Sequence, residues 1–203
     1  MNKSGALIAL ALSLFAVVSF AAEPIDKAYV KSLAAPNKNV LVVEYLDGED
    51  KVVDRKGYAS ETGWNAKSAT EFEATKGVML KLFGVGPCKG ELVVKSENFA
   101  GTCDDYAKAN LQTMLSSAHV IFCRSFITEQ SAASQDTTCY GYYAVPGAMD
   151  SVDMVEEQLV SLGALRPTKK ANGTSARPDL ADAEEIGKKG SYGMWADPRT
   201  RKQ

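Results

Sequence analysis

Four cysteines, Cys88, Cys103, Cys123 and Cys139, constrain this chain more than any other feature, because their chemistry depends on the compartment. No two of them are spaced as Cys-x-x-Cys, so the sequence favours neither a zinc site nor a thioredoxin-type redox site. In an oxidising compartment an even set predicts disulfides, and three pairings are open. The sequential pairs, Cys88–Cys103 and Cys123–Cys139, would close loops of similar length. Each would constrain the unfolded chain by about 3 kcal/mol.

The N-terminus indicates that the chain enters such a compartment. Lys3 is followed by an apolar run from Ala6 to Phe20, and small residues lie at Ser19 and Ala21. These are the parts of a secretory signal peptide. The run is about 15 residues long, shorter than the roughly 20 that a membrane-spanning helix needs. We expect a signal peptide over residues 1–21, a periplasmic or secreted protein, and no transmembrane segment after cleavage. An uncleaved membrane anchor is the alternative.

The composition excludes several function classes. The chain has 203 residues and is 45% hydrophobic, enough to bury a core without metals. It carries 23 basic and 25 acidic side chains, which argues against a protein that mainly coats nucleic acid. Its single histidine, His119, disfavours a Ser-His-Asp triad and a His-rich metal site. The charge is uneven: residues 22–165 hold 13 basic and 20 acidic side chains, whereas residues 166–203 hold 9 and 5.

Hydrophobic patterning predicts an α+β domain. A β-branched run over residues 39–45, an Asp-Gly turn and a second run over 51–53 predict a hairpin. Further strands are expected at 78–83, 120–122 and 140–145, and helices at 104–115, 151–162 and 179–189. Gly163 is expected to end the second helix. Residues 22–37 are expected to be a tether, 54–76 a loop or short strand, and 128–138 and 167–178 loops.

Several short strings, in the same order as these elements, resemble the staphylococcal nuclease-like (thermonuclease) family. They are Asp47-Gly48-Glu49, residues 80–87, Asp136 with Tyr140-Gly141, residues 151–164, and Ala183-Glu184 with residues 193–196. The resemblance implies an OB-fold, a five-stranded β-barrel, packed by three helices. With it, the chain divides into a signal peptide (1–21), an N-terminal extension (22–38), a nuclease-like domain (39–198) and a basic C-terminal tail (199–203).

The resemblance also implies which positions would carry a nuclease's chemistry. Acidic residues would hold Ca²⁺, a carboxylate would act as general base on water, and two arginines would stabilise the phosphate. The positions that match these roles are the first metal ligand Glu49 with Asp47 or Asp50 nearby, the second metal ligand Gly86, the base Cys88, and the two arginine positions Lys81 and Tyr140.

The residues at those positions cannot fill the roles. Gly86 has no side chain, Lys81 lacks the forked donors of arginine, and Tyr140 has no positive charge. We interpret Cys88 as having converted the catalytic loop into a disulfide-linked loop, with Cys103 as partner. We therefore assign no catalytic residue, and no cofactor is expected.

Two residues nearby offer replacements without matching the family's pattern. Glu91 and Arg124 carry suitable charges but lie at other positions. A rearranged, calcium-dependent secreted nuclease, with Asp47 and Glu49 as metal ligands, is therefore the alternative function.

The first hypothesis is a catalytically inactive binding or structural module of the cell envelope, and a structural subunit of an envelope complex is a third possibility. An acidic body favours a protein partner, and nucleic acid is possible because OB-folds stack bases on aromatic side chains. Strand alternation puts Tyr140 and Tyr142 on one face and Tyr143 on the other, for stacking or for ordinary packing. Trp195 is expected in the core, and the basic tail in solvent.

Overall fold

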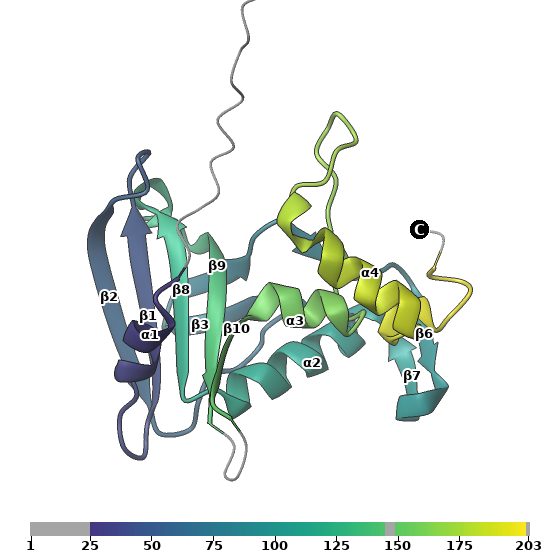
Figure 1. Ribbon diagram of the computed structural model, residues 1–203, viewed down its shortest axis with the longest axis horizontal. Helices are drawn as coiled ribbons and strands as arrows, with labels where there is room; N and C mark the ends of the chain where they lie inside the picture. Colours follow the sequence, from purple (N-terminus) through teal and green to yellow (C-terminus); the bar gives the residue numbers. More distant parts are fainter. Residues whose placement is uncertain (1–24, 145–148, 202–203) are drawn as a thin grey trace, which may run out of the picture.

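The chain folds into an α+β unit built on one strongly curled, mixed sheet that forms a half-barrel (Figure 1). The computed structural model describes residues 25–144 and 149–201. The expected signal peptide lies outside these residues. Within them, the helices are all too short or too polar to cross a membrane.

The main sheet has the strand order β2-β1-β8-β9-β4-β3, with β10 paired to the second half of β9. Its strands are β1 (Asn39–Leu46), β2 (Val52–Ser60), β3 (Glu71–Thr75), β4 (Val78–Leu82), β8 (Val120–Phe126), β9 (Ser134–Tyr143) and β10 (Ser151–Met154). The pairs β1·β8 and β4·β9 are parallel and the other pairs are antiparallel. Because two of its strand pairs are parallel, the sheet differs from a barrel in which all neighbouring strands are antiparallel.

Two small sheets extend the fold away from the half-barrel. One joins β5 (Val85–Gly86) to β11 (Arg166–Pro167), and the other joins β6 (Glu91–Val94) to β7 (Phe99–Thr102). Short 3₁₀ helices follow several strands and loops: η1 (Lys95–Glu97), η2 (Ile127–Glu129), η3 (Pro178–Leu180) and η4 (Gly193–Trp195).

The main core lies between one face of the sheet and helices α2 (Cys103–Ser117), α3 (Val155–Ser161) and α4 (Ala181–Gly190). Leu41, Leu80, Leu111 and Leu159 are fully buried in it. Trp195 is buried there too, which confirms its predicted place in the core. We call the opposite side of the sheet the outer face.

A second, smaller core lies on the outer face, under a helix that the sequence did not predict. Residues 22–37 were expected to be a tether, which is wrong for α1 (Lys27–Ser32). Asp26 caps α1 by accepting from the backbone N–H groups of Ala28 and Tyr29. Val30 is fully buried against Val42, Val120, Phe122 and Val152. A six-residue helix is too short to be stable by itself, so this contact explains its formation.

Other boundaries also differ from those predicted. Residues 151–154 were expected to begin a helix but form β10, because they pair with β9 and Val152 enters the second core. Likewise, β9 begins at Ser134, inside the expected loop, because its first residues pair in parallel with β4. The predicted hairpin, the helix after Asp104 and the helix end at Gly163 are confirmed by β1·β2, α2 and α3. Gly163 follows α3 with φ 66°, a conformation that favours glycine.

Candidate functional site

The outer face of the sheet carries a charged row beside the second core. Strand register places Arg55 of β2, Glu44 of β1 and Arg124 of β8 side by side. Thr138 of β9 lies opposite Arg124 and continues the row. Because side chains alternate along a strand, these residues share a face with Val42 and Phe122. The charged row lies beside α1, whose Tyr29 ring centroid is 5.4 Å from the guanidinium carbon of Arg55.

Glu44 is the centre of this row and is buried by its two basic neighbours. Its carboxylate lies 2.7 Å from Nε of Arg55 and 3.4 Å from Nε of Arg124, and its side chain is 3% exposed. The hydrogen bond to Glu44 raises the pKa of Arg55. A buried carboxylate needs such partners, because an unpaired charge is costly to desolvate. Of the two arginines, Arg55 keeps the more exposed side chain, at 54% against 25% for Arg124.

The next row along the strands is apolar and open to solvent. Leu46 lies beside Phe126, and Val53 is the extra residue of a bulge at the end of the β1·β2 ladder. Phe126 is 56% exposed and Val53 48% exposed. Exposed large hydrophobic side chains beside arginines are typical of protein-binding surfaces. We call Val53, Phe126, Arg55, Glu44 and Arg124 the outer-face site.

The positions matched to the nuclease chemistry are dispersed. Lys81 in β4 lies opposite Asp136 of β9, with Nζ 3.8 Å from Oδ1. Tyr140 is on the same face but four residues further along β9 and half-buried beside the second core. Gly86 pairs with Arg166 in a small sheet, away from both.

The acidic residues expected as metal ligands lie in the turn between β1 and β2. The Asp47 carboxylate accepts from the backbone N–H groups of Glu49 and Lys51, which stabilises the turn. Asp50 has φ 60°, as turn residues often do. Among the described residues, no group of three or more His, Cys, Asp or Glu side chains is arranged to hold a metal ion.

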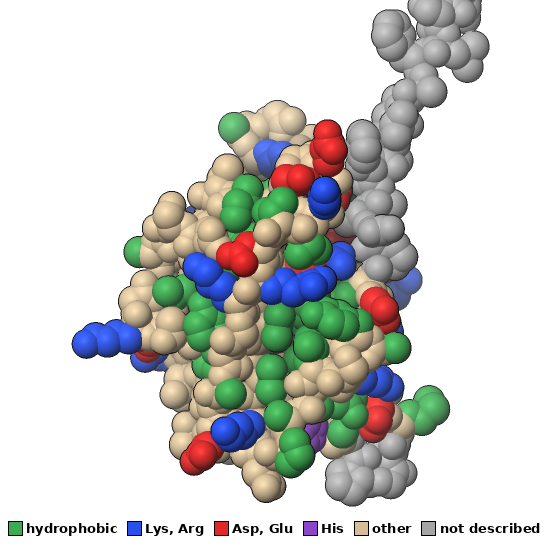
Figure 2. Space-filling view, turned by 90° about the vertical axis from the view of Figure 1, so that its left-hand side faces the viewer, with side chains coloured by type: hydrophobic (Ala, Val, Ile, Leu, Met, Phe, Trp, Pro, Cys, Tyr) green, Lys and Arg blue, Asp and Glu red, His purple; other side chains and the backbone are tan. Residues whose placement is uncertain are grey.

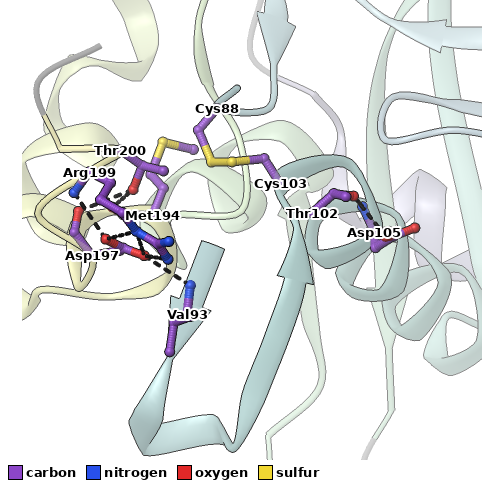
Figure 3. Close-up of a disulfide and its surroundings, with 9 residues drawn as sticks. All are labelled: Cys88, Val93, Thr102, Cys103, Asp105, Met194, Asp197, Arg199 and Thr200. Carbon is purple, nitrogen blue, oxygen red and sulfur yellow. Dashed lines mark hydrogen bonds and ion pairs between the residues drawn. A yellow bond between two sulfur atoms is a disulfide. The ribbon is translucent and has the colours of Figure 1, made fainter. Parts of the chain in front are cut away.

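Cys88, at the position of the base, is joined to Cys103 at the start of α2 (Figure 3). The other disulfide joins Cys123 of β8 to Cys139 of β9, so the structure contains the sequential pairs. Both disulfides fit a secreted protein. Glu91, a possible replacement base, is exposed at the start of β6.

Close to this disulfide, the C-terminal segment is anchored: Arg199 and Arg201 are exposed, as expected for a tail in solvent, but Thr200 is buried. Figure 3 shows Asp197 between Arg199 and the backbone N–H of Val93 in β6, at 2.6 and 3.0 Å. Hydrogen bonds from Arg199 hold the pKa of Asp197 below its ordinary range. Thr200 is fully buried and donates to the Met194 carbonyl, and Arg201 donates to the Trp195 carbonyl.

A second charged cluster lies under Tyr140. Glu156 of α3 is fully buried, accepts from the backbone N–H of Cys139, and lies 3.6 Å from Nη1 of Arg177. Arg177 also binds the Asp179 carboxylate and the Phe83 carbonyl. Burial raises the pKa of Glu156 to about 7, although Arg177 opposes the shift. These bonds tie α3, β9 and the segment before α4 together.

The remaining tyrosines of β9 lie on opposite faces of the sheet, and the buried hydroxyl of Tyr143 has no hydrogen-bond partner among the described residues. Alternation places Tyr142 beside Tyr140 on the outer face and Tyr143 in the main core, as predicted. Tyr142 donates to Asp150, and its ring lies against that of His119, with centroids 6.0 Å apart. His119 is exposed just before β8.

Sequence reasoning missed Glu44 and assigned Arg124 only as a replacement for an arginine. The available signal was a carboxylate inside the apolar run Val40–Leu46. Strand alternation places Glu44 on the same face as Val40 and Val42. If that face is buried, the carboxylate of Glu44 requires a basic partner. The partner from β8 is distant in sequence and depends on the parallel pairing.

Comparisons with known proteins add no assignment: no family model matches the chain, and no curated protein matches it.

Proposed function

We propose that this protein is a periplasmic or secreted binding module, built on a nuclease-like OB scaffold without the family's catalytic residues, that holds an envelope protein at the outer-face site. The observation that carries the proposal is the exposed Phe126 and Val53 beside the Arg55–Glu44–Arg124 row. A partner that buries these apolar groups and offers a carboxylate to the exposed part of Arg55 would match this surface.

Three features support the scaffold and the compartment. The order of strands, α2, the β8·β9 pair and the last two helices follows the order that the resemblance implies. The two disulfides favour an oxidising compartment. The leader-like residues 1–21 favour export.

The residue types support binding rather than phosphodiester hydrolysis. Cys88, which the resemblance matches to the general base, is disulfide-bonded. Lys81, which it matches to one of the two arginines, forms an ion pair with Asp136. Retained nuclease activity with Ca²⁺ at Asp47 and Glu49 is the second candidate, which the acidic turn between β1 and β2 favours.

The test compares Phe126→Ser with Ile186→Ser, because the two side chains are equally exposed, at 56% and 55%, on different elements. Affinity capture from an envelope extract should retain the same protein with wild type and with Ile186→Ser. Phe126→Ser should lower its retention by about tenfold or more, because a buried hot-spot residue typically contributes about 2 kcal/mol or more. Equal retention by both variants would refute the site.

A nuclease assay separates the second candidate. The purified protein should leave single-stranded DNA intact with and without Ca²⁺. Calcium-dependent cleavage that is abolished by Glu49→Gln or Lys81→Ala would overturn the binding-module proposal in favour of the nuclease.

A further inference from the structure

The strand β2 has an open edge. It is nine residues long, and in the described part of the chain it pairs only with β1 (Figure 1). Its central residues are exposed on both faces. An exposed edge of this length offers unpaired N–H and C=O groups to another strand.

Two other strand edges are covered, at least in part. Residues 66–68 lie along β3, where the N–H groups of Lys67 and Ser68 both donate to the Glu71 carbonyl. The Asp197 carboxylate takes the N–H of Val93 in β6. Among the described residues no other segment pairs with the long edge of β2, and the N–H of Arg55 is taken by the neighbouring Asp54 carboxylate.

The direction of the backbone groups can be read from Arg55. Its N–H donates to the Asp54 carboxylate at 2.8 Å and not to β1. Along one strand of an antiparallel ladder, the backbone N–H groups point alternately toward the partner strand and away from it. The N–H groups of residues 55, 57 and 59 therefore point away from β1, out of the sheet edge. These are the groups that an added strand would use.

We propose that two copies of this chain pair through β2, antiparallel, about a two-fold axis at Arg55. This register sets Asp54 of each copy opposite Lys56 of the other, so two opposite-charge pairs form across the axis. It also sets Arg55 opposite Arg55, and each of these arginines is already paired with its own Glu44. Centring the axis on residue 54 or 56 instead would oppose Asp54 to Asp54 or Lys56 to Lys56.

Among these three registers, the charges of β2 therefore favour the one centred on Arg55. Lysine and other charged side chains usually protect an edge from pairing. Figure 2, viewed from the side on which β2 lies, shows acidic and basic side chains next to one another on this surface. Pairing at Arg55 turns this mixture into complementary contacts, and it joins the charged rows of the two copies into one continuous face.

Sedimentation of the purified, oxidised protein tests the assembly. We expect a concentration-dependent monomer–dimer equilibrium. Lys56→Asp should weaken the dimer by about tenfold or more, because it sets like charges opposite each other twice, and the double variant Asp54→Lys/Lys56→Asp should restore it. A monomer at every concentration, or a dimer that Lys56→Asp leaves unchanged, would overturn the proposal.

Cysteine pairing tests the register. A mixture of Asp54→Cys chains and Lys56→Cys chains should form a disulfide-linked dimer that keeps one Asp54–Lys56 pair. Each variant alone should form at least tenfold less, because its cysteines are not opposite each other. The native cysteines are all paired in the described chain, so they do not compete. Equal cross-linking in all three samples would contradict the register. Capture by Phe126→Ser does not depend on this result, so the two proposals fail separately.

Discussion

At the scale of single residues, backbone conformation and close approach decide which side chains are tolerated. Gly163 and Gly173 both have positive φ, 66° and 81°. A Cβ on Gly163 would lie 2.3 Å from the Tyr192 carbonyl oxygen, whereas a Cβ on Gly173 would meet nothing within 4 Å. The glycine predicted as a helix end therefore has a second role, since it lets the segment before η4 pack against α3.

The two glycines provide a matched prediction. Gly173→Ala should lower the free energy of unfolding by about 1 kcal/mol, the cost of the left-handed conformation. Gly163→Ala should lower it by about 3 kcal/mol or more, because it adds a collision with backbone. Urea unfolding of both variants measures the difference, and equal losses would contradict the close approach.

At the scale of elements, the Cys88–Cys103 disulfide holds the start of α2 to the segment after β5. Thr102 caps α2 by accepting from the Asp105 N–H, and the Cys103 N–H donates to the Gly90 carbonyl. The small β6·β7 sheet lies within the loop that this disulfide closes. Cys88 thus serves to connect two elements.

Removing this disulfide should destabilise the protein without unfolding it. Cys88→Ser/Cys103→Ser should lower the free energy of unfolding by about 3 kcal/mol, the loop-closure value for a 15-residue separation. Non-reducing peptide mapping must first find Cys88 linked to Cys103 in the wild type. A free Cys88, or a variant as stable as wild type, would rule out this role.

At the scale of the whole molecule, the Glu156–Arg177–Asp179 cluster joins the sheet to the helical layer. Burial raises the pKa of Glu156 from 4.5 to about 7 in the folded protein. The folded state therefore binds this proton more tightly than the unfolded state. The resulting stabilisation is complete below about pH 4.5 and is lost as the pH rises through about 7.

Glu156→Gln should remove this dependence. Between pH 5 and 8, the wild type should lose about 2 kcal/mol more unfolding free energy than the glutamine variant. Glu157→Gln is the control, because Glu157 is the exposed neighbour in α3. Carboxyls with lowered pKa values, such as Asp179, titrate below this window. Parallel pH curves for wild type and Glu156→Gln would contradict the assignment.

The sequence by itself determined the local structure of this protein and part of its chemistry. The Asp-Gly hairpin, the helix after Asp104, the Gly163 helix end and the two faces of Tyr140 to Tyr143 depend on neighbouring residues, so periodicity and turn chemistry predict them. The same reasoning failed for α1 and β10, whose short segments gain stability only from partners distant in the chain.

Only the tertiary structure decided where the charges meet. The parallel pairing of β1 with β8 brings Arg124 to Glu44, and the loop before α4 brings Arg177 to Glu156. Neither contact has a signal at short spacing, because the partners are about 80 and 21 residues apart. Desolvation makes each buried carboxylate require a cation, and only the folded chain determines which cation is near.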